Sequence, residues 1–562
     1  MSRFLDLLLT SAAQSPRGMT TGEPREPVRR SWAQVHSTAR RMAADLVNGG
    51  LRPGTSVAVL AGEPALIAPA AQAVWLAGGS VTMLHQPTPR TDLAEWAEDT
   101  VRVLGMIGAG MVLLGPPFDP LSDVLTQRGI TVRPISELGT AFSDTDADPP
   151  IPVLTEGNGE DDTALLQLTS GSTADPKAVR ITHGNLYANL TAMVTASELR
   201  VERDVMVSWL PLFHDMGMVG FLTVPMTVGL ELVTVTPVDF LSRPLLWAEL
   251  ISKYGGTVTA APNFAYAVLG RQLGRAKDGS MDLSSMRFAL NGAEPIDPEA
   301  VASFTTAGAR FGLRPDCVVA AYGMAETALG VSFAPIDTGL QVDTIDADQL
   351  EANRRAVVVD PEVEPDRPVR RFPLLGPPLP GLEARVLDDQ GRVLGDREVG
   401  TIQLRGEAVT PGYLTVHGPV ATQDEDGWLD TGDQGYQAGG IVVVCGRLKD
   451  VIIMGGRNIY PTDIERAAAE ADGVRAGNVV AVRLDAGSGV GSSKRESFVV
   501  VVESRRAGDA EAEEMIRKEV TARVVSSVGV RPARVVVLAP ASLPKTPSGK
   551  LRRAATRELL DA

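Results

Sequence analysis

The sequence predicts an α/β protein with a large N-terminal domain of α/β layers, a small β-rich subdomain, and a small, mobile α+β domain at the C-terminus. Apolar strand-like runs alternate with helix-like runs between residues 56 and 323. From about residue 373 the pattern changes to short alternating runs separated by glycines, and after residue 448 to a compact α+β pattern. A chain of 562 residues is also too long for one hydrophobic core.

These changes of pattern set the expected domain boundaries. We expect the large domain at 1–447, with the β-rich subdomain at about 373–447, and the hinged C-terminal domain at 448–562. The segment 340–372 is charged and contains prolines, so we expect it to be an insertion or a solvent-facing segment.

The N-terminal part begins with a strand, a helix and another strand. SVAVLAG at 56–62 precedes an apolar, helix-like run near 65–77, and SVTMLH follows at 80–85. Further strand-like runs occupy 111–115 and 130–135. Strands separated by helix-length segments are typical of parallel sheets. The run near 65–77 contains almost no polar residue, which favours a buried helix.

Four later apolar runs end in turn-forming or polar residues. They occupy 231–237, 257–262, 288–295 and 318–323. Ligands bind at the carboxyl ends of strands in open α/β sheets. We therefore expect the loops after these strands to converge on one crevice.

Composition excludes several classes of protein. The net charge of −16 argues against a general binder of nucleic acid or of anionic membranes. Cys317 and Cys445 are far apart and form no metal or redox spacing, so a reducing, cytoplasmic location is expected. No stretch offers about 18 uninterrupted apolar residues, so no transmembrane segment is expected.

The stretch TSGSTADPK at 169–177 suggests the first ligand. Glycine lets the backbone approach a ligand closely, successive N–H groups in a sharp bend bind anions, and the hydroxyls add donors. A polyphosphate fits these groups, although a solvated loop between two elements fits them too. The stretch is not a Walker A loop, which requires GxxxxGK[ST]. The candidate phosphate contacts are Thr169, Ser170, Gly171, Ser172, Thr173 and Lys177.

Five further motifs carry polar residues at turns. WLPLFHDMGM at 209–218 offers His214, and DTGDQGY at 430–436 offers Asp433 on a tight turn, suited to two ribose hydroxyls. Each motif, taken singly, also fits an ordinary turn or a solvated charge. The other three are NGAEP with Asn291, Gly292, Ala293 and Glu294; AYGMAET with Tyr322, Gly323, Glu326 and Thr327; and GRLKD with Arg447 and Lys449. LPKTPSGKLRR at 543–553 adds Lys550 on a basic C-terminal loop.

Taken together and in this order, the motifs resemble the adenylate-forming superfamily, which includes acyl-CoA synthetases, adenylation domains, luciferase-like enzymes and fatty-acyl-AMP ligases. The resemblance covers nearly the whole chain. It implies that ATP activates a carboxylic acid to an acyl-adenylate, with release of pyrophosphate. Ala174 and Ala178 depart from the pattern, because glycines commonly stand at both positions. We expect ATP binding to be retained.

The stretches HDMG, AAPNFAY, IDADQLEANRRAV and GRNIYPTDIE most resemble the fatty-acyl-AMP ligases, and the overall similarity is closest to actinobacterial ones. This branch implies a medium- or long-chain fatty acid, and transfer to the phosphopantetheine thiol of an acyl carrier protein, or of a carrier domain of a polyketide or nonribosomal peptide synthase. Such ligases serve lipid, polyketide or siderophore biosynthesis. The candidate insertion at 340–372 matches an extra segment of that branch.

Three alternatives remain open. The first is a fatty-acyl-CoA ligase that uses free CoA, the second an amino-acid adenylation enzyme, and the third a non-catalytic binding protein on the same scaffold. An amino-acid enzyme usually places an aspartate in the substrate pocket to pair with the α-amine. Asp215, within HDMG, is not a clear substitute.

The resemblance also assigns roles to the residues. Lys550 bridges the carboxylate and the α-phosphate, Glu326 holds Mg²⁺, and Lys449 is the hinge. Tyr322 and the backbone of 291–294 hold adenine, Asp433 and Arg447 hold ribose, and the 169–177 loop binds the β- and γ-phosphates. His214 is a further catalytic candidate. A basic rim of Lys545, Lys550, Arg552 and Arg553 could steer an acidic carrier protein.

Overall fold

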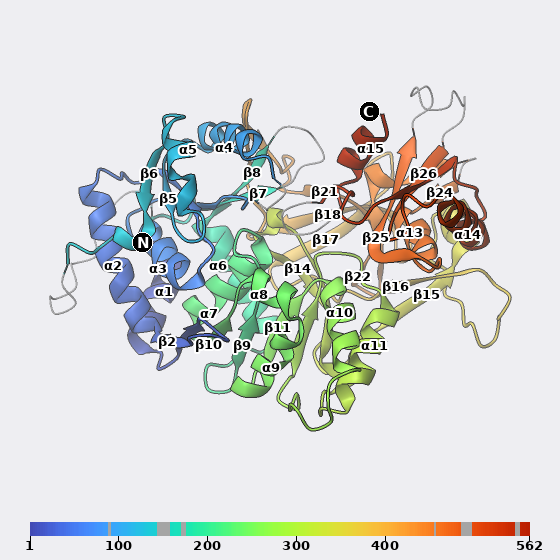
Figure 1. The fold of residues 1–562 in the computed structure, drawn as a ribbon, viewed down its shortest axis with the longest axis horizontal. Coiled ribbons are helices and arrows are strands. Elements are labelled where there is room, and N and C mark those ends of the chain that lie inside the picture. The colour runs from blue at the N-terminus through green and yellow to red at the C-terminus, as the bar shows by residue number, and fades with distance from the viewer. Residues whose placement is uncertain are drawn as a thin grey trace.

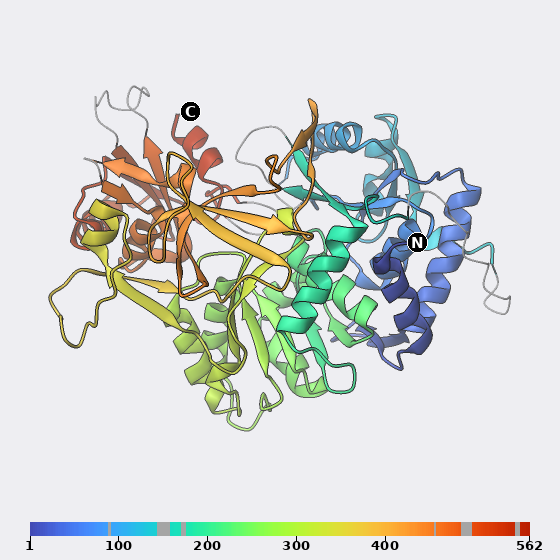
Figure 2. The same ribbon diagram turned by 180° about the vertical axis from the view of Figure 1, so that it is seen from behind.

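The computed structural model describes residues 1–87, 91–142, 158–169, 176–454, 457–484, 497–545 and 551–561. Two eight-stranded sheets with helices around them form the large N-terminal part, and smaller sheets follow (Figures 1 and 2). The predicted α/β class, with a large N-terminal and a small C-terminal part, is confirmed.

The first large sheet has the order β14-β13-β12-β11-β9-β10-β1-β2. Its inner strands are parallel, so their carboxyl ends meet at one edge, whereas β14 and β2 are antiparallel to their neighbours. The strands are β1 (Gly18–Thr21), β2 (Val28–Ser31), β9 (Val205–Ser208), β10 (Glu231–Thr234), β11 (Val258–Ala261), β12 (Phe288–Asn291), β13 (Val318–Gly323) and β14 (Gly330–Phe333).

The second large sheet has the order β20-β19-β8-β7-β4-β3-β5-β6. The strands expected near residues 56, 80, 111 and 130 are present and parallel, which confirms that part of the prediction. The strands are β3 (Ser56–Leu60), β4 (Ser80–Met83), β5 (Ala109–Leu114), β6 (Thr131–Pro134), β7 (Thr163–Thr169), β8 (Lys177–Thr182), β19 (Gly412–Thr415) and β20 (Gly418–Ala421).

Local sequence explains where the helices begin. Thr182 ends β8 and caps the next helix, since its side chain accepts the Asn185 N–H while the Asn185 side chain accepts the Thr182 N–H. The helix expected near 65–77 is buried along nearly its whole length, as predicted. The helices of the large part are α1 (Arg3–Gln14), α2 (Trp32–Asn48), α3 (Pro64–Leu76), α4 (Leu93–Ile107), α5 (Ser122–Thr126), α6 (His183–Ala196), α7 (Val224–Val228), α8 (Pro237–Ser242), α9 (Leu245–Tyr254), α10 (Asn263–Leu273), α11 (Pro298–Ala309) and α12 (Ala347–Asn353).

The residues expected to be rich in β-structure form a four-stranded antiparallel sheet, β17-β18-β21-β22. The C-terminal part has its own hydrophobic cluster, separate from the main core. The strands are β17 (Leu382–Leu387), β18 (Gly400–Gly406), β21 (Leu429–Ala438), β22 (Ile441–Arg447), β23 (Ile452–Met454), β24 (Arg457–Ile459), β25 (Val474–Leu484), β26 (Ser497–Ser504) and β27 (Arg534–Leu538). The C-terminal helices are α13 (Pro461–Ala469), α14 (Ala510–Val528) and α15 (Arg553–Asp561).

The sequence predicts an insertion or a solvent-facing segment at 340–372, and the structure contradicts the solvent-facing alternative for part of it. It forms a two-stranded sheet of β15 (Val342–Asp346) and β16 (Val369–Pro373), with α12 between them. Ile345, Leu350 and Phe372 are buried in one cluster with Tyr460 of the C-terminal part. The description as solvent-facing is therefore wrong for these residues, because their apolar side chains pack between the two parts of the chain.

Within the ranges that the structure describes, no helix is both long enough and apolar enough to cross a bilayer.

Candidate active site

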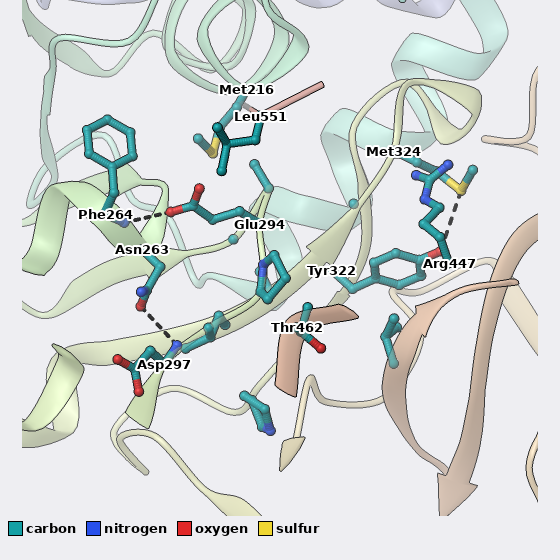
Figure 3. Close-up of a pocket in the computed structure, with 18 of the residues that line it drawn as sticks. Met216, Asn263, Phe264, Glu294, Asp297, Tyr322, Met324, Arg447, Thr462 and Leu551 are labelled. Atoms are coloured by element: carbon teal, nitrogen blue, oxygen red, sulfur yellow. Dashed lines mark hydrogen bonds between the residues drawn. The ribbon is translucent and has the colours of Figure 1, made fainter. Parts of the chain in front are cut away.

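One cleft of about 2220 Å³ gathers most of the residues that the sequence singled out (Figure 3). It is lined by residues of the large part, of the four-stranded sheet and of the C-terminal part. The predicted site residues that line it are Thr169, Lys177, His214, Gly292, Ala293, Glu294, Tyr322, Gly323, Glu326, Asp433, Arg447 and Lys449. The loops after β11, β12 and β13 converge on this crevice as expected, whereas none of the described residues 231–237 lines it.

Two predicted nucleotide contacts do not line the cleft. Asn291 is fully buried and its Nδ2 donates to Asn263 Oδ1 at 3.1 Å, so it holds the start of α10. Thr327 is also fully buried, and its hydroxyl donates to the Met324 carbonyl at 3.0 Å. Their side chains therefore have structural partners. Ser170, Gly171, Ser172, Thr173 and Lys550 lie outside the described residues.

Strand ends form the part of the cleft where the sequence predicts adenine and ribose contacts. β13 carries Tyr322 at its carboxyl end, and β21 and β22 pair Asp433 with Arg447. The Tyr322 hydroxyl donates to Asp433 Oδ2 at 2.5 Å, and Arg447 Nε lies 2.8 Å from Asp433 Oδ1. Figure 3 shows Tyr322, Met324 and Arg447 side by side. One carboxylate is thus oriented by a phenol and a guanidinium.

Burial affects the protonation of both Asp433 and Tyr322. It raises the pKa of Asp433, while the guanidinium of Arg447 and the bond from Tyr322 oppose that change. Burial and the neighbouring carboxylate of Asp433 also raise the pKa of Tyr322, so its hydroxyl stays a donor. An ionised Asp433 fits a pair of ribose hydroxyls, because a carboxylate is an acceptor with two oxygens.

Two polar side chains, Thr169 and Lys177, lie where the sequence predicts phosphate contacts. Thr169 Oγ1 is buried and has no hydrogen-bond partner among the described residues. Thr169 pairs with Lys177 across β7 and β8, so their side chains share one face of the sheet. An orphaned hydroxyl beside an ammonium fits an anionic ligand such as a polyphosphate.

Glu326 is the residue in this region that fits a divalent cation. Within the described ranges, no group of three or more His, Cys, Asp or Glu side chains is arranged to hold a metal ion. Mg²⁺ is often held by one or two carboxylates together with substrate phosphates. Glu326 on η5 (Ala325–Thr327) lines the cleft, as does Lys177. One carboxylate beside a cation that can hold phosphates fits Mg²⁺ bound to a nucleotide.

Two histidines, His214 and His85, line the cleft, and the sequence analysis missed His85. His214 Nδ1 lies 2.6 Å from Asp215 Oδ1, and the Asp215 carboxylate also accepts the Met216 N–H at 2.7 Å at the start of η3 (Met216–Thr223), a π-helical segment. Burial, followed by the nearby charges of His214 and Arg552, lowers the pKa of His85 to about 4. Its position directly after β4 was a usable signal, because polar residues at strand ends often contact ligands.

Apolar side chains continue the lining away from the nucleotide residues. They come from α6, η3, α10, strands of the first sheet and loops between these elements. The set includes Met193, Leu199, Met206, Met216, Phe221, Val258, Phe264, Phe288, Leu290, Leu329, Phe333 and Leu375. The lining can therefore shelter an apolar substrate group next to the nucleotide region.

The C-terminal part reaches the same cleft. Lys545, Leu551 and Arg552 line it, and the Arg552 N–H donates to the Pro544 carbonyl at 3.0 Å. Leu551 and Met216 both line this cleft and are labelled in Figure 3. Lys545 and Leu551, the described residues on either side of the stretch that contains Lys550, both line the cleft. Arg553 also lines the cleft, and its charge is offset by two bonds of 2.8 Å from its guanidinium to Glu465.

Comparisons with known proteins agree with this geometry. The family model "AMP-binding enzyme" matches residues 10–414. Rv1013 of Mycobacterium tuberculosis, provisionally named as a ligase, is 56% identical over 99% of both chains. A protein of Caulobacter vibrioides, provisionally named as an acyl-CoA synthetase, is 35% identical over 93% of this chain and 88% of its own.

Two further comparisons carry more specific names. JamA of Moorena producens, a medium-chain-fatty-acid–[acyl-carrier-protein] ligase, is 33% identical over 71% of this chain and 67% of its own. A solved structure of fatty acyl-adenylate ligases from E. coli and L. pneumophila is 30% identical, covers 100% of this chain and 98% of its own, and superposes with a TM-score of 0.86. The chain belongs to the AMP-binding enzymes, the adenylate-forming superfamily of ligases.

Proposed function

We propose that this ligase activates a medium- or long-chain fatty acid as its acyl-adenylate, with release of pyrophosphate, and then transfers the acyl group to the phosphopantetheine thiol of an acyl carrier protein. The observation that carries the proposal is the continuity of the cleft lining. Apolar side chains such as Met206, Phe288 and Leu290 line the same cleft as Tyr322 and Asp433. The names of JamA and of the solved fatty acyl-adenylate ligases support the fatty acid as substrate.

In the first half-reaction the carboxylate attacks the α-phosphate of ATP, and pyrophosphate leaves. Both reactants are anions, so the residues must mainly neutralise charge and align the reacting atoms. Lys177 contributes a positive charge beside the phosphates, and Asp433 and Arg447 hold the ribose. Mg²⁺, when bound at Glu326, supplies further neutralisation of phosphate charge.

Lys550 is assigned to the bridge between the carboxylate and the α-phosphate. A point charge on a flexible stem suits a residue that must arrive for one half-reaction and leave for the next. The cleft-lining positions of Lys545 and Leu551 support this assignment, because they flank the stretch that contains Lys550. We assign the hinge for this movement to Lys449, on η6 (Leu448–Asp450), where the four-stranded sheet ends. Burial lowers the pKa of Lys449.

The strongest rival is an acyl-CoA ligase of the same fold, which the name of the Caulobacter relative favours. An amino-acid adenylation enzyme is less well supported. Its substrate aspartate should face the α-amine, whereas Asp215 is engaged by His214 and by the Met216 N–H.

Mass spectrometry of the products tests the proposal. The purified chain is given ATP, Mg²⁺ and a series of fatty acids and amino acids, with CoA and candidate carrier proteins offered in parallel. We expect acyl-AMP with fatty acids and no aminoacyl-AMP with amino acids. We expect acylated carrier protein when the carrier has its phosphopantetheine arm. Efficient release of acyl-CoA would identify the rival ligase, and aminoacyl-AMP would identify the amino-acid enzyme.

A further inference from the structure

Tyr413 contacts two charged residues of the cleft. The Lys177 Nζ lies 3.9 Å from the centroid of its ring, and its hydroxyl donates to Glu326 Oε1 at 2.6 Å. Lys177 and Glu326 line the cleft, whereas Tyr413 does not. Tyr413 therefore acts on the site through its contacts with Lys177 and Glu326, and does not itself line the space that a ligand would occupy.

Strand pairing fixes the position of the ring. β19 is antiparallel to β8, with Tyr413 opposite Val179 and Thr415 opposite Lys177. Side chains at paired and alternate positions share a face, so Lys177 is a diagonal neighbour of Tyr413. Thr169 pairs with Lys177 from β7, so its buried hydroxyl lies on the same face. Three adjacent strands thus present a hydroxyl, an ammonium and a phenol together.

The same segment also fixes Glu326. The Thr410 N–H donates to the Glu326 carbonyl at 2.8 Å, and the Thr410 hydroxyl donates to the Arg180 carbonyl of β8. The backbone of Glu326 is therefore held by Thr410, just before β19, and its side chain by Tyr413 within β19. This double attachment limits the orientations that the carboxylate can adopt.

The chemistry of the phenol suits this task. Burial, and then the neighbouring Glu326, raise the pKa of Tyr413, so its hydroxyl remains a donor. Its hydrogen bond uses Oε1, and a carboxylate has a second oxygen with which to bind a cation. The face of an aromatic ring attracts an ammonium. Groups that orient a metal ligand in this way commonly change metal affinity when they are removed.

We propose that Tyr413 is a positioning residue for the phosphate end of the nucleotide: its ring places the Lys177 ammonium and its hydroxyl orients the Glu326 carboxylate, so that both act on one polyphosphate and its metal ion. The proposal rests on the proposed function for the roles of Lys177 and Glu326. It does not depend on which acid the enzyme activates.

The test measures metal and nucleotide binding without any acid present. Mn²⁺ binding to the full chain with α,β-methylene-ATP is followed by electron paramagnetic resonance, and binding of the analogue without metal is measured separately. Tyr413→Phe keeps the ring and removes the hydroxyl, so we expect the Mn²⁺ Kd to rise by about tenfold with little change in analogue binding. Tyr413→Leu also removes the ring, and should weaken the binding of the analogue without metal several-fold.

Two controls separate positioning from a general structural effect. Tyr187 is also half-buried and carries the Arg3 guanidinium 4.4 Å from its ring centroid, but it does not line the cleft, so Tyr187→Phe should leave both affinities unchanged. In a Glu326→Gln background, Tyr413→Phe should change the Mn²⁺ Kd less than about twofold, because its partner carboxylate is gone.

Three outcomes would overturn the proposal. They are wild-type Mn²⁺ binding in Tyr413→Phe, wild-type analogue binding in Tyr413→Leu, and an undiminished effect of Tyr413→Phe in the Glu326→Gln background. If Tyr413→Leu does not fold, the two-residue cycle still decides the role of the hydroxyl. If the metal-binding results are as expected but the protein activates no fatty acid, the proposed function is refuted and the role of Tyr413 is not.

Discussion

Asp433 illustrates how single side chains set the nucleotide region. Tyr322 and Arg447 reach its two oxygens from different strands, at 2.5 and 2.8 Å. Burial raises the pKa of Asp433, and Arg447 counteracts this effect. The carboxylate is thus kept in one place before a nucleotide arrives, which lowers the cost of ordering it on binding.

Replacing Asp433 by Asn should weaken nucleotide binding selectively. The variant loses the charge that pairs with Arg447 and one acceptor for a ribose hydroxyl, so we expect the KM for ATP to rise by about tenfold or more. Steady-state kinetics with a melting curve measures this change. Asp430→Asn is the matched control, since Asp430 lies exposed on the same strand. Equal KM values for both variants would remove Asp433 from the ribose site.

A buried histidine that does not line the cleft should make stability depend on pH. His183 is fully buried, its Nδ1 lies 3.0 Å from Ser2 Oγ, and burial lowers its pKa to about 4. Between pH 6.5 and 4 the unfolded chain binds a proton that the folded chain does not, so stability falls as the pH falls.

The contribution of His183 amounts to about 3 kcal/mol once the pH has fallen through this window. Urea unfolding between pH 7 and pH 4.5 should therefore show a smaller loss of stability in His183→Asn than in the wild type. Parallel pH profiles for the two proteins would refute this role.

At the scale of elements, the segment of β15, α12 and β16 joins the two parts of the chain. Arg370 of β16 bonds Glu351 at 2.6 Å and Asp463 of α13 at 3.1 Å, and its guanidinium lies 5.0 Å from the ring centroid of Tyr460. Since Ile345 and its neighbours share a buried cluster with Tyr460, point variants test this segment better than a deletion does.

Arg370→Met should destabilise the protein. The substitution removes the guanidinium that pairs with two largely buried carboxylates, Glu351 and Asp463, and breaking a buried ion pair typically costs about 3–5 kcal/mol. Denaturant unfolding measures the cost, and Arg371→Met, at the exposed neighbouring position, is the control. A loss below about 1 kcal/mol for Arg370→Met would show that the two carboxylates find other compensation.

The sequence analysis was most successful for features that depend on the order of residues along the chain. The parallel strands, the buried helix α3 and the loops bearing Tyr322, Glu326 and Asp433 follow from hydrophobic pattern and from motif order. Contacts between distant strands could not be read in this way. Tyr413 meets Lys177 only because β19 pairs with β8, and that register depends on the folded sheet. The inward orientation of Asn291 likewise depends on its bond to Asn263 in α10.

At the scale of the whole molecule, the cleft is completed by the C-terminal part, which contributes Lys545, Leu551 and Arg552 to its lining. The C-terminal strands and helices lie on the side of the molecule away from α1 and α2 in both ribbon views (Figures 1 and 2). The two proposed half-reactions require different charges in the cleft. A change in the orientation of the C-terminal part between them would provide each set of charges in turn.

Lys550→Ala should separate the half-reactions. Acyl-AMP formation should fall by at least about 100-fold, because nothing else is assigned to bridge the two anions, whereas transfer from synthetic acyl-AMP to the carrier should change less than about threefold. Single-turnover assays of each step measure this. Lys518→Ala, at an exposed position of α14, is the control. Equal losses in both steps would contradict the assigned role.

The central claim is that a fatty carboxylate attacks the α-phosphate of ATP in this cleft. A fatty acid labelled with ¹⁸O in both carboxyl oxygens tests it directly, in one complete turnover with ATP and a carrier protein. Attack at the α-phosphate transfers one carboxyl oxygen to the phosphorus, and it stays there when the thiol takes the acyl group, so the released AMP should carry one ¹⁸O. Unlabelled AMP, or label found in inorganic phosphate beside ADP, would contradict the account.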